Sequence, residues 1–304
     1  MDVNANSLRY FVAVSEERHF GRAAARLHVT TPSLSEQISR LEKKVRSDLF
    51  IRSPRGVELT DAGRELLPLA RTALDAHDAV SVWGAQRLLP QGGTVRVGIF
   101  AAAAAPLRTA AHEDLAERHP DLVVTTRRIG VDEAFGMLRE GRIDLAYMPE
   151  PLPVVAAGVR WASVTQQRRV LVVPANHPLA GRANVGIEET NDEVFIPLAS
   201  IEQAAVDWWL VDPRPDGTRV ERGPVAADFE AMLDLCAAGQ GLGMAGSFAA
   251  DHYSRPGVRF LPLRDVEDAR TALCWRADER DPGVLAYVTT TRRVAAEMGS
   301  PPPS

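Results

Sequence analysis

Through the first ninety residues, apolar side chains recur every three or four positions, the spacing of a helix with one buried face. Two such runs lie on either side of residues 28–31, which favour a tight turn. Their inward-facing residues are Ala23, Ala24 and Leu27 in the first run, and Leu34, Ile38 and Leu41 in the second. Thr30 or Thr31 can cap the second helix, with Pro32 in its first turn, where proline is favoured. The pattern predicts a pair of short helices, a further segment and a small basic β-hairpin that ends near residue 60.

The outward face of the second helix is polar, with short hydroxyl and amide side chains near its start and cations further along. Such donors suit base edges and phosphates when a helix lies in the major groove of DNA. We expect base readout by Ser33, Ser35, Gln37 and Arg40, and the predicted DNA-binding set also includes Thr30, Thr31 and Pro32 at the helix start. Phosphate or minor-groove contacts are expected from Arg22, Arg52 and Arg55.

Another helical seam runs from Asp61 to about Leu89, so the sequence predicts one long helix with Thr60 as its N-cap. A helix cannot bury such a seam alone, and pairing with a partner is expected. Beyond Thr94, short apolar runs alternate with helical periods, which is typical of a mostly parallel α/β sheet. Strands are expected at 95–100, 122–129, 143–148, 168–174, 195–199, 218–222, 242–245 and 270–276. Helices are expected at 106–118, 131–140, 229–238 and 284–297, and around Trp208 and Trp209.

The charge of the chain is unevenly distributed. The 304 residues carry a net charge of −5, which does not suit a DNA-binding protein until it is divided. Residues 1–60 hold ten Lys and Arg against seven Asp and Glu, a net charge of +3, and the remainder carries −8. A basic head on an acidic body confines the attraction for phosphate to the head. Because +3 is modest, the working unit is expected to be at least a dimer.

The order of residues in this head resembles the N-terminal domain of the LysR-type transcriptional regulators. The matched positions are Leu8, Phe11, Phe20, Ala23, Ala24, Leu27, Pro32, Ser35, Gln37, Ile38, Leu41, Glu42, Leu49, Phe50, Arg52, Leu59, Thr60 and Gly63. Further matches, such as Gly141-Arg142-Ile143-Asp144 and His177-Pro178-Leu179, extend the resemblance over essentially the whole chain. One departure is Arg46, because the family usually has a glycine there as a left-handed helix cap. Arg46 therefore predicts a strained or re-formed helix end.

The resemblance implies a fold class and a domain plan. An all-α winged helix-turn-helix domain (1–60) and a long linker or dimerisation helix (61–90) precede an α/β effector-binding region (94–304). That region has two Rossmann-like lobes, like the periplasmic binding proteins: lobe I at about 94–150 and 267–298, and lobe II at about 164–263. The implied partners are double-stranded operator DNA, a small-molecule effector, and further copies of the chain in a homodimer or homotetramer. RNA polymerase is a candidate further partner.

In the family, hydroxyl groups in two loops of lobe I often hold an effector carboxylate. At the corresponding positions this chain has Ala102 and Val131, and its hinge at 147–151 supplies Met148 and Pro149 instead of an arginine. A carboxylate that loses its water without gaining donors costs several kcal/mol, so a small carboxylate effector is disfavoured. We expect a larger, mostly apolar or aromatic effector. Its predicted contacts are Phe100, Ala101, Ala102, Val131, Tyr147, Met148, Pro149, Ser200, Asp228 and Ser247.

Other chemistries are disfavoured. The string GLGMAG (241–246) matches the GxGxxG of dinucleotide sites, but it follows a helix and leads into a strand, the reverse of the required order. The seven histidines are dispersed, no nucleophile motif is present, and Cys236 and Cys274 lie in apolar segments. We therefore expect no enzyme activity, metal or cofactor. The absence of a signal-peptide core or a membrane-spanning run favours a cytoplasmic location and no membrane partner.

Two alternatives remain open. One is a regulator of this type that needs no small molecule and is controlled by a partner protein or by its own abundance. The other is a solute-binding or enzymatic α/β protein with an incidental helical head.

Overall fold

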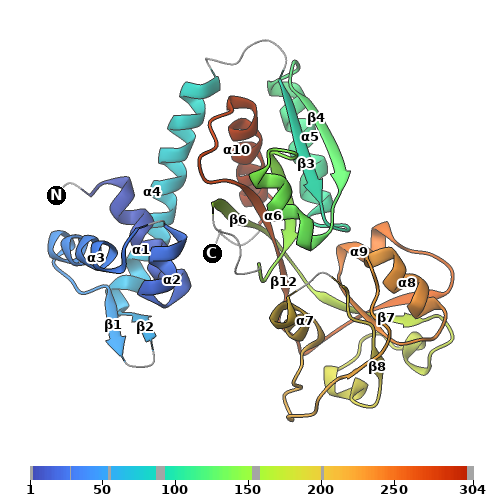
Figure 1. The fold of residues 1–304 in the computed structure, drawn as a ribbon. Coiled ribbons are helices and arrows are strands. Elements are labelled where there is room, and N and C mark those ends of the chain that lie inside the picture. Colours follow the sequence, from blue (N-terminus) through green and yellow to red (C-terminus); the bar gives the residue numbers. More distant parts are fainter. Residues whose placement is uncertain are drawn as a thin grey trace. The chain divides into compact units, whose positions relative to one another are not determined.

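The computed structural model describes residues 3–27, 29–53, 56–86, 93–152, 158–199 and 202–299. The chain forms two compact units, residues 1–90 with 280–289, and residues 91–279 with 290–302 (Figure 1). Each unit has a hydrophobic core of its own.

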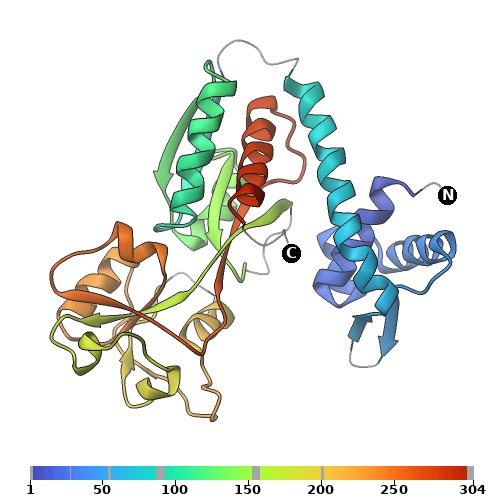
Figure 2. The same ribbon diagram turned by 180° about the vertical axis from the view of Figure 1, so that it is seen from behind.

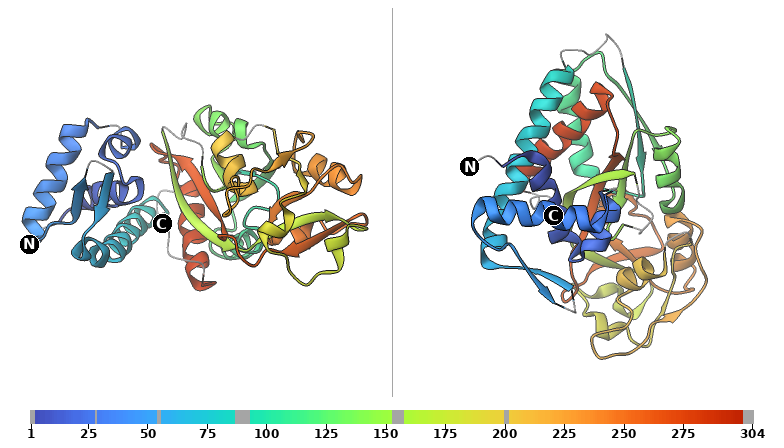
Figure 3. Two further views of the ribbon diagram at one scale, coloured as in Figure 1. Left: turned by 90° about the horizontal axis from the view of Figure 1, so that it is seen from below. Right: turned by 60° about the vertical axis from the view of Figure 1, so that its left-hand side comes forward.

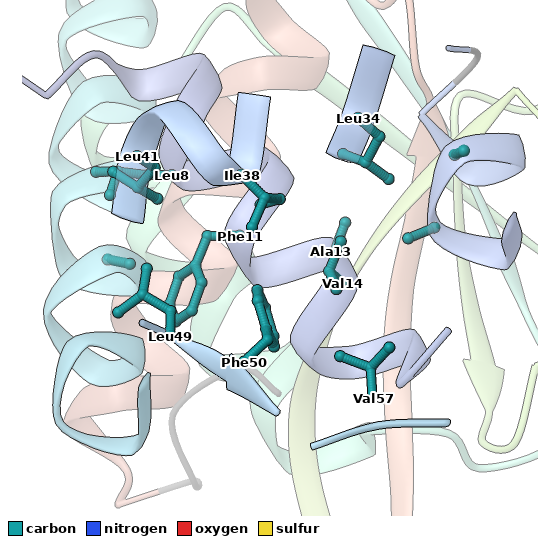
Figure 4. Packing of buried hydrophobic residues seen from close by; sticks show 13 residues of the cluster. Leu8, Phe11, Ala13, Val14, Leu34, Ile38, Leu41, Leu49, Phe50 and Val57 are labelled. Carbon is teal, nitrogen blue, oxygen red and sulfur yellow. The ribbon is translucent and has the colours of Figure 1, made fainter. Parts of the chain in front are cut away.

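The first unit is built around three short helices and a hairpin. Its elements are α1 (Ala5–Glu17), α2 (Phe20–Arg26), α3 (Thr31–Val45), β1 (Phe50–Ser53), β2 (Gly56–Leu59) and the long α4 (Asp61–Gln86). Strands β1 and β2 pair antiparallel, as expected of a wing. The rings of Phe11 in α1 and Phe50 in β1 are tilted against each other with their centroids 5.4 Å apart, and they join the helices to the hairpin (Figure 4). The rest of this core includes Leu8, Val14, Leu34, Ile38, Leu41, Leu49 and Val57.

Both ends of α3 are fixed by local hydrogen bonds. At the start, the Thr30 side chain accepts from the backbone N–H of Ser33 at 3.4 Å. At the end, Arg46 adopts a left-handed conformation with φ of 56°, and its N–H donates to the carbonyl of Glu42. The Glu42 carboxylate in turn accepts from the N–H of Leu49 at 3.0 Å, which ties the helix to the wing. The expected strained helix end at Arg46 is confirmed.

Helix α4 begins where Thr60 caps it. The Thr60 hydroxyl accepts from the N–H of Gly63 at 3.0 Å and donates to the carbonyl of Asp48 at 2.7 Å. The structure describes the helix as far as Gln86, and the last predicted residues, 87–89, lie outside the described part of the chain. Pro68 lies inside the helix without ending it.

Lobe I of the second unit is a five-stranded sheet covered on both faces. In the order β4-β3-β5-β12-β6, its strands are β4 (Val123–Arg128), β3 (Thr94–Ile99), β5 (Leu145–Pro149), β12 (Ala269–Arg276) and β6 (Val159–Gln167). Its helices are α5 (Ala105–Arg118), α6 (Val131–Arg139) and the part of the last helix, α10 (Pro282–Glu297), that begins at Thr290. The first three strands are parallel to one another, and β12 runs antiparallel to both its neighbours (Figure 2).

Lobe II is built on a smaller antiparallel sheet in the order β10-β7-β11. Its strands are β7 (Arg169–Pro174), β8 (Val194–Phe195), β9 (Glu221–Arg222), β10 (Gly243–Gly246) and β11 (Val258–Pro262). Its helices are α7 (Gln203–Leu210), α8 (Phe229–Ala237) and α9 (Phe248–His252), with short 3-10 turns at Pro178–Gly181 and Ile187–Thr190. Two segments connect the lobes, from β6 to β7 and from β11 to β12 (Figure 3).

The topology departs from the mostly parallel sheet that the alternation predicted. Strands β6 and β11 were not expected, and the predicted strands at 195–199 and 218–222 shrink to two residues each. The chain crosses between the lobes twice and must run back along the sheet each time, which makes the crossing strands antiparallel. The predicted return of the last strand to lobe I is confirmed, because β12 pairs with β5.

Candidate DNA-binding helix and ligand cleft

Helix α3 buries one face and presents the other to solvent. Leu34, Ile38 and Leu41 are at most 1% exposed and belong to the core of the first unit. On the opposite side, Ser33 and Arg40 are exposed, and Ser35 and Gln37 are half-buried. Thr30, Thr31 and Pro32 are all exposed at the helix start. The structure thus brings the seven predicted helix contacts together on one capped helix.

The Arg40 guanidinium is already engaged on the helix surface. It lies 2.6 Å from the Glu36 carboxylate, one turn earlier, and both side chains are 62% exposed. Exposed pairs of this kind contribute at most about 1 kcal/mol, so a phosphate or a guanine edge can displace Glu36.

The predicted phosphate contacts lie on other elements. Arg22 of α2 is exposed, and its guanidinium donates to the backbone carbonyl of Glu17. Arg52 lies on β1, but its side chain is outside the described part of the structure, as is the whole of Arg55. His19, which the sequence did not single out, caps α2: its Nδ1 accepts from the N–H of Gly21 at 3.0 Å.

The second unit contains a cavity between its lobes with a volume of about 90 Å³, here called the apolar cavity. Lobe I contributes the loop from Phe100 to Ala103, and lobe II contributes α7 and the end of β10. Its lining includes Phe100, Ala101, Ala102, Pro149, Gln167, Ile196, Leu198, Trp209, Phe229, Met244, Phe248, Arg270 and Thr271. Since a cavity of about 150 Å³ admits one benzene ring, a ligand enclosed here is no larger than a single small ring.

A second cavity, of about 290 Å³, lies beside the first and has a more polar rim. The two share Phe100, Ala101, Leu198 and Phe229 as lining residues. The second cavity adds Arg128, Val131, Asp132, Asp228, Glu230 and Tyr253. An effector larger than one ring would have to extend from the apolar cavity into this space.

The predicted effector contacts divide between the two cavities. Ala102 and Pro149 line the apolar cavity, Val131 and Asp228 line the second, and Phe100 and Ala101 line both. The Asp228 carboxylate also caps α8, where it accepts from the N–H of Ala231 at 2.8 Å. Ser200 lies outside the described residues.

Three predicted contacts lie elsewhere. Tyr147 and Met148 are fully buried within β5, because helices cover both faces of that strand, and neither side chain reaches either cavity. Tyr147 contacts the Thr291 hydroxyl at 3.2 Å, and Met148 packs under α6. Ser247 is half-buried at the start of α9 and lines neither cavity. The prediction for Tyr147 and Met148 was wrong because it took both from a hinge that the sheet buries.

The sequence places Met148 and Pro149, and no arginine, at the hinge of residues 147–151. In the structure an arginine comes from the second crossing segment, where Arg270 of β12 lines the apolar cavity. Gln167, at the end of β6, adds an amide. No local motif marks either residue, because the two crossing strands bring them together from positions 103 residues apart.

The loop of lobe I that carries Ala102 has a strained backbone. Ala101 and Ala104 both adopt left-handed conformations, with φ of 45° and 51°. Residues with a Cβ rarely occupy this region, and such outliers cluster at binding sites. The loop ends at α5, whose N-cap, Ala104, provides no side-chain hydrogen bond.

The remaining sequence motifs have structural roles. Residues 241–246 follow α8 and lead into a strand, as expected: 241–242 end the turn and Gly243–Gly246 form β10. A Cβ on Gly241 would lie 2.8 Å from the carbonyl of Val194. Both cysteines are fully buried, and the Cys236 thiol donates to the carbonyl of Val172 at 3.4 Å. Burial raises the pKa of the Cys236 thiol to about 12 and also raises that of Cys274. Among the described helices, none is long and apolar enough to span a membrane.

Comparison with known proteins extends these observations. Residues 5–64 match the family described as bacterial regulatory helix-turn-helix protein, lysR family, and residues 90–296 match the LysR substrate binding domain. The regulator AlsR of Bacillus subtilis is 28% identical over 284 residues, which are 92% of this chain and 93% of that protein. A probable hydrogen peroxide-inducible genes activator of Mycobacterium avium is 32% identical over 239 residues, 78% of this chain and 75% of that one. The oxidized form of OxyR from Corynebacterium glutamicum has a similar structure, with a TM-score of 0.58, 25% identity, and coverage of 99% and 96% of the two chains.

Proposed function

The chain belongs to the LysR family of bacterial DNA-binding transcriptional regulators. From that premise we propose that α3 recognises the operator sequence and that a small molecule bound in the cleft controls DNA binding. The observation that carries the DNA-binding part is the division of α3 into one buried and one polar face. The buried face fixes the orientation of the helix, so Ser33, Gln37 and Arg40 are held on the side available to a major groove.

The working unit in this proposal is a homodimer or a homotetramer with twofold symmetry, which matches a dyad operator. Two large apolar side chains on α4 support such pairing: Leu69 is 66% exposed and Val80 is 68% exposed. Both lie on the apolar seam that the sequence predicts for this helix. The complex would act in the cytoplasm, with RNA polymerase as a candidate further partner, and without enzyme activity.

The effector is proposed to bind in the apolar cavity, between residues of both lobes. A ligand there contacts the Phe100–Ala103 loop of lobe I and α7 of lobe II at once, so its binding changes the preferred angle between the lobes. The effect on DNA binding can be no larger than the ligand's preference for one arrangement over the other.

Control by thiol oxidation is a second mode to consider, since one relative is named as a probable hydrogen peroxide-inducible activator. The thiolate is the reactive form of cysteine, and burial here opposes its formation in both residues. We therefore propose reversible ligand binding as the mode of control in this chain.

The proposal is tested by footprinting on the promoter beside the gene. Gln37→Ala and Arg40→Ala should each weaken operator binding roughly tenfold to a hundredfold, since a base contact contributes about 1–3 kcal/mol. Arg118→Ala is a matched control, because Arg118, which is 60% exposed, also pairs with a carboxylate one turn away, that of Asp114 in α5. Wild-type footprints from both α3 variants would contradict the assignment of α3 as the recognition helix.

The same footprints, recorded with and without small metabolites, separate the modes of control. Effector control predicts that at least one metabolite shifts or strengthens protection. Protection that depends only on protein concentration or on an added protein would instead support a regulator controlled by abundance or by a partner.

A further inference from the structure

We propose that the effector carries a carboxylate and that Arg270 is the residue that binds it, within a cavity that is otherwise apolar. This inference rests on the proposed effector control, and it assigns the chemical class of the ligand. The specificity-determining donors are thereby placed on the two crossing strands instead of the loops of lobe I.

Among the described residues, Arg270 is a cation without a partner. It lines the apolar cavity from β12, between the buried residues Ala269 and Thr271. Within the described part of the chain its guanidinium forms no hydrogen bond and no ion pair, even with Asp268 or with Glu150 across the strand pair.

Several other arginines of this unit are paired. Arg169 donates to the carbonyls of Glu267 at 2.7 Å and Trp208 at 2.8 Å, and Arg222 lies 2.5 Å from the carboxylates of both Asp207 and Asp212. Arg270 therefore lacks the partners that these arginines have, and it lines the cavity.

A second donor lies beside it. The Gln167 side chain lines the same cavity, and its carbonyl oxygen accepts from the N–H of Phe248 at 2.8 Å, which fixes the amide. Its NH₂ group has no partner in the described structure. Gly246 makes room for this arrangement, since a Cβ there would lie 2.4 Å from the Gln167 side chain.

The strands are irregular at this point. The register of β12 against β6 shifts between Thr271 and Ala272, one residue beyond Arg270. Bulges of this kind re-aim neighbouring side chains and are frequent beside binding sites.

These groups select between ligand classes. Arginine stays charged at every accessible pH, so its guanidinium must keep water or gain an anion. A wholly apolar ligand would remove that water and replace it with nothing, which is unfavourable. A carboxylate would instead accept two N–H bonds from the guanidinium and one from Gln167. The volume of about 90 Å³ restricts the part of the ligand enclosed in the apolar cavity to a small apolar group.

Titration of the full-length protein with matched acids and amides tests the proposal. The probes are isobutyrate with isobutyramide, and benzoate with benzamide, at millimolar concentrations. On the wild type, at least one acid should bind about tenfold or more tightly than its amide, as expected of a charged hydrogen bond. Arg270→Gln should reduce this preference to less than about threefold, and Arg270→Lys should keep part of it. Arg259→Gln is the control, since it removes the same charge from an exposed position on β11 outside both cavities.

Amides that bind the wild type as well as the acids do, or an acid preference that survives Arg270→Gln, would overturn the proposal. In either case the cleft still binds ligands, and effector control stands. Absence of binding by all four probes also counts against the carboxylate, and footprinting with metabolites then tests effector control independently.

A measurement without ligand provides a second test. Replacing a residue that serves only to bind a ligand does not destabilise the free protein. Replacing a residue that stabilises the fold does destabilise it. Arg270→Gln should therefore change the Tm by less than about 2 °C, and Arg169→Gln should lower it by more than about 5 °C. An equal loss in both variants would make Arg270 a structural residue and refute its role as the anchor.

Discussion

Replacing Gly63 with alanine should destabilise the first unit, because the added methyl group has no room. Gly63 lies in the first turn of α4, where the helix crosses the segment that enters the wing. A Cβ at this position would lie 2.3 Å from the carbonyl oxygen of Leu49 and 2.8 Å from the Leu59 side chain. The nearer contact is with backbone, so it cannot be relieved by a rotamer change.

The size of the effect follows from two opposing contributions. Alanine favours a helix interior over glycine by about 1 kcal/mol. Against this, the oxygen of Leu49 must move about 1 Å, although it accepts from the N–H of Thr60 at 3.0 Å. Overpacking of this kind costs about 1–3 kcal/mol, and loss of the hydrogen bond about 1 kcal/mol more. We expect a net loss of about 1–3 kcal/mol in the free energy of unfolding of this unit.

Gly136→Ala provides the matched control. Gly136 is also helical, in α6 of the second unit, and nothing lies within 4 Å of its would-be Cβ. It should therefore gain the helix preference alone, about 0.5–1 kcal/mol. Hydrogen exchange of the full-length protein in increasing urea reports each unit separately. If Gly63→Ala stabilises its unit as Gly136→Ala does, the steric argument is refuted.

Two further predictions concern Arg46 and Cys236. Arg46→Gly should raise the stability of the first unit by about 1 kcal/mol in the same exchange experiment, because glycine adopts the left-handed conformation without strain. Unchanged or lower stability would mean that the cap is not strained. The pKa of the Cys236 thiol has its ordinary value of 9 in the unfolded chain and a value of about 12 in the folded one. Its contribution to stability is therefore present below pH 9 and is lost as the pH rises towards 12. The stability difference between the wild type and Cys236→Ala should therefore shrink above pH 9, and a difference that is constant with pH would contradict the raised pKa.

The first unit could be predicted closely from the sequence because its signals are local. The cap at Thr30, the buried face of α3 and the left-handed cap at Arg46 each depend on residues within one or two turns of each other. In the second unit, β3, α5 and α8 were also predicted to within two residues. Strand β6 was missed because its nine residues alternate irregularly and include polar positions that the sheet buries, such as Ser163 and Thr165.

The ligand cleft could be predicted only in part, because its chemistry depends on contacts between distant segments. The loop at 100–103, which the sequence predicts as a ligand contact, lines the apolar cavity, since that loop follows a buried strand. Trp209, Phe248 and Arg270 reach the apolar cavity only because the chain crosses twice between the lobes, and helical or strand periodicity carries no information about those crossings. The missing hydroxyls at Ala102 and Val131 therefore do not show that the cleft lacks donors. Under the proposed effector control, a substitution on a crossing strand, far in sequence from α3, should change which ligand the protein recognises while leaving its DNA-binding surface intact.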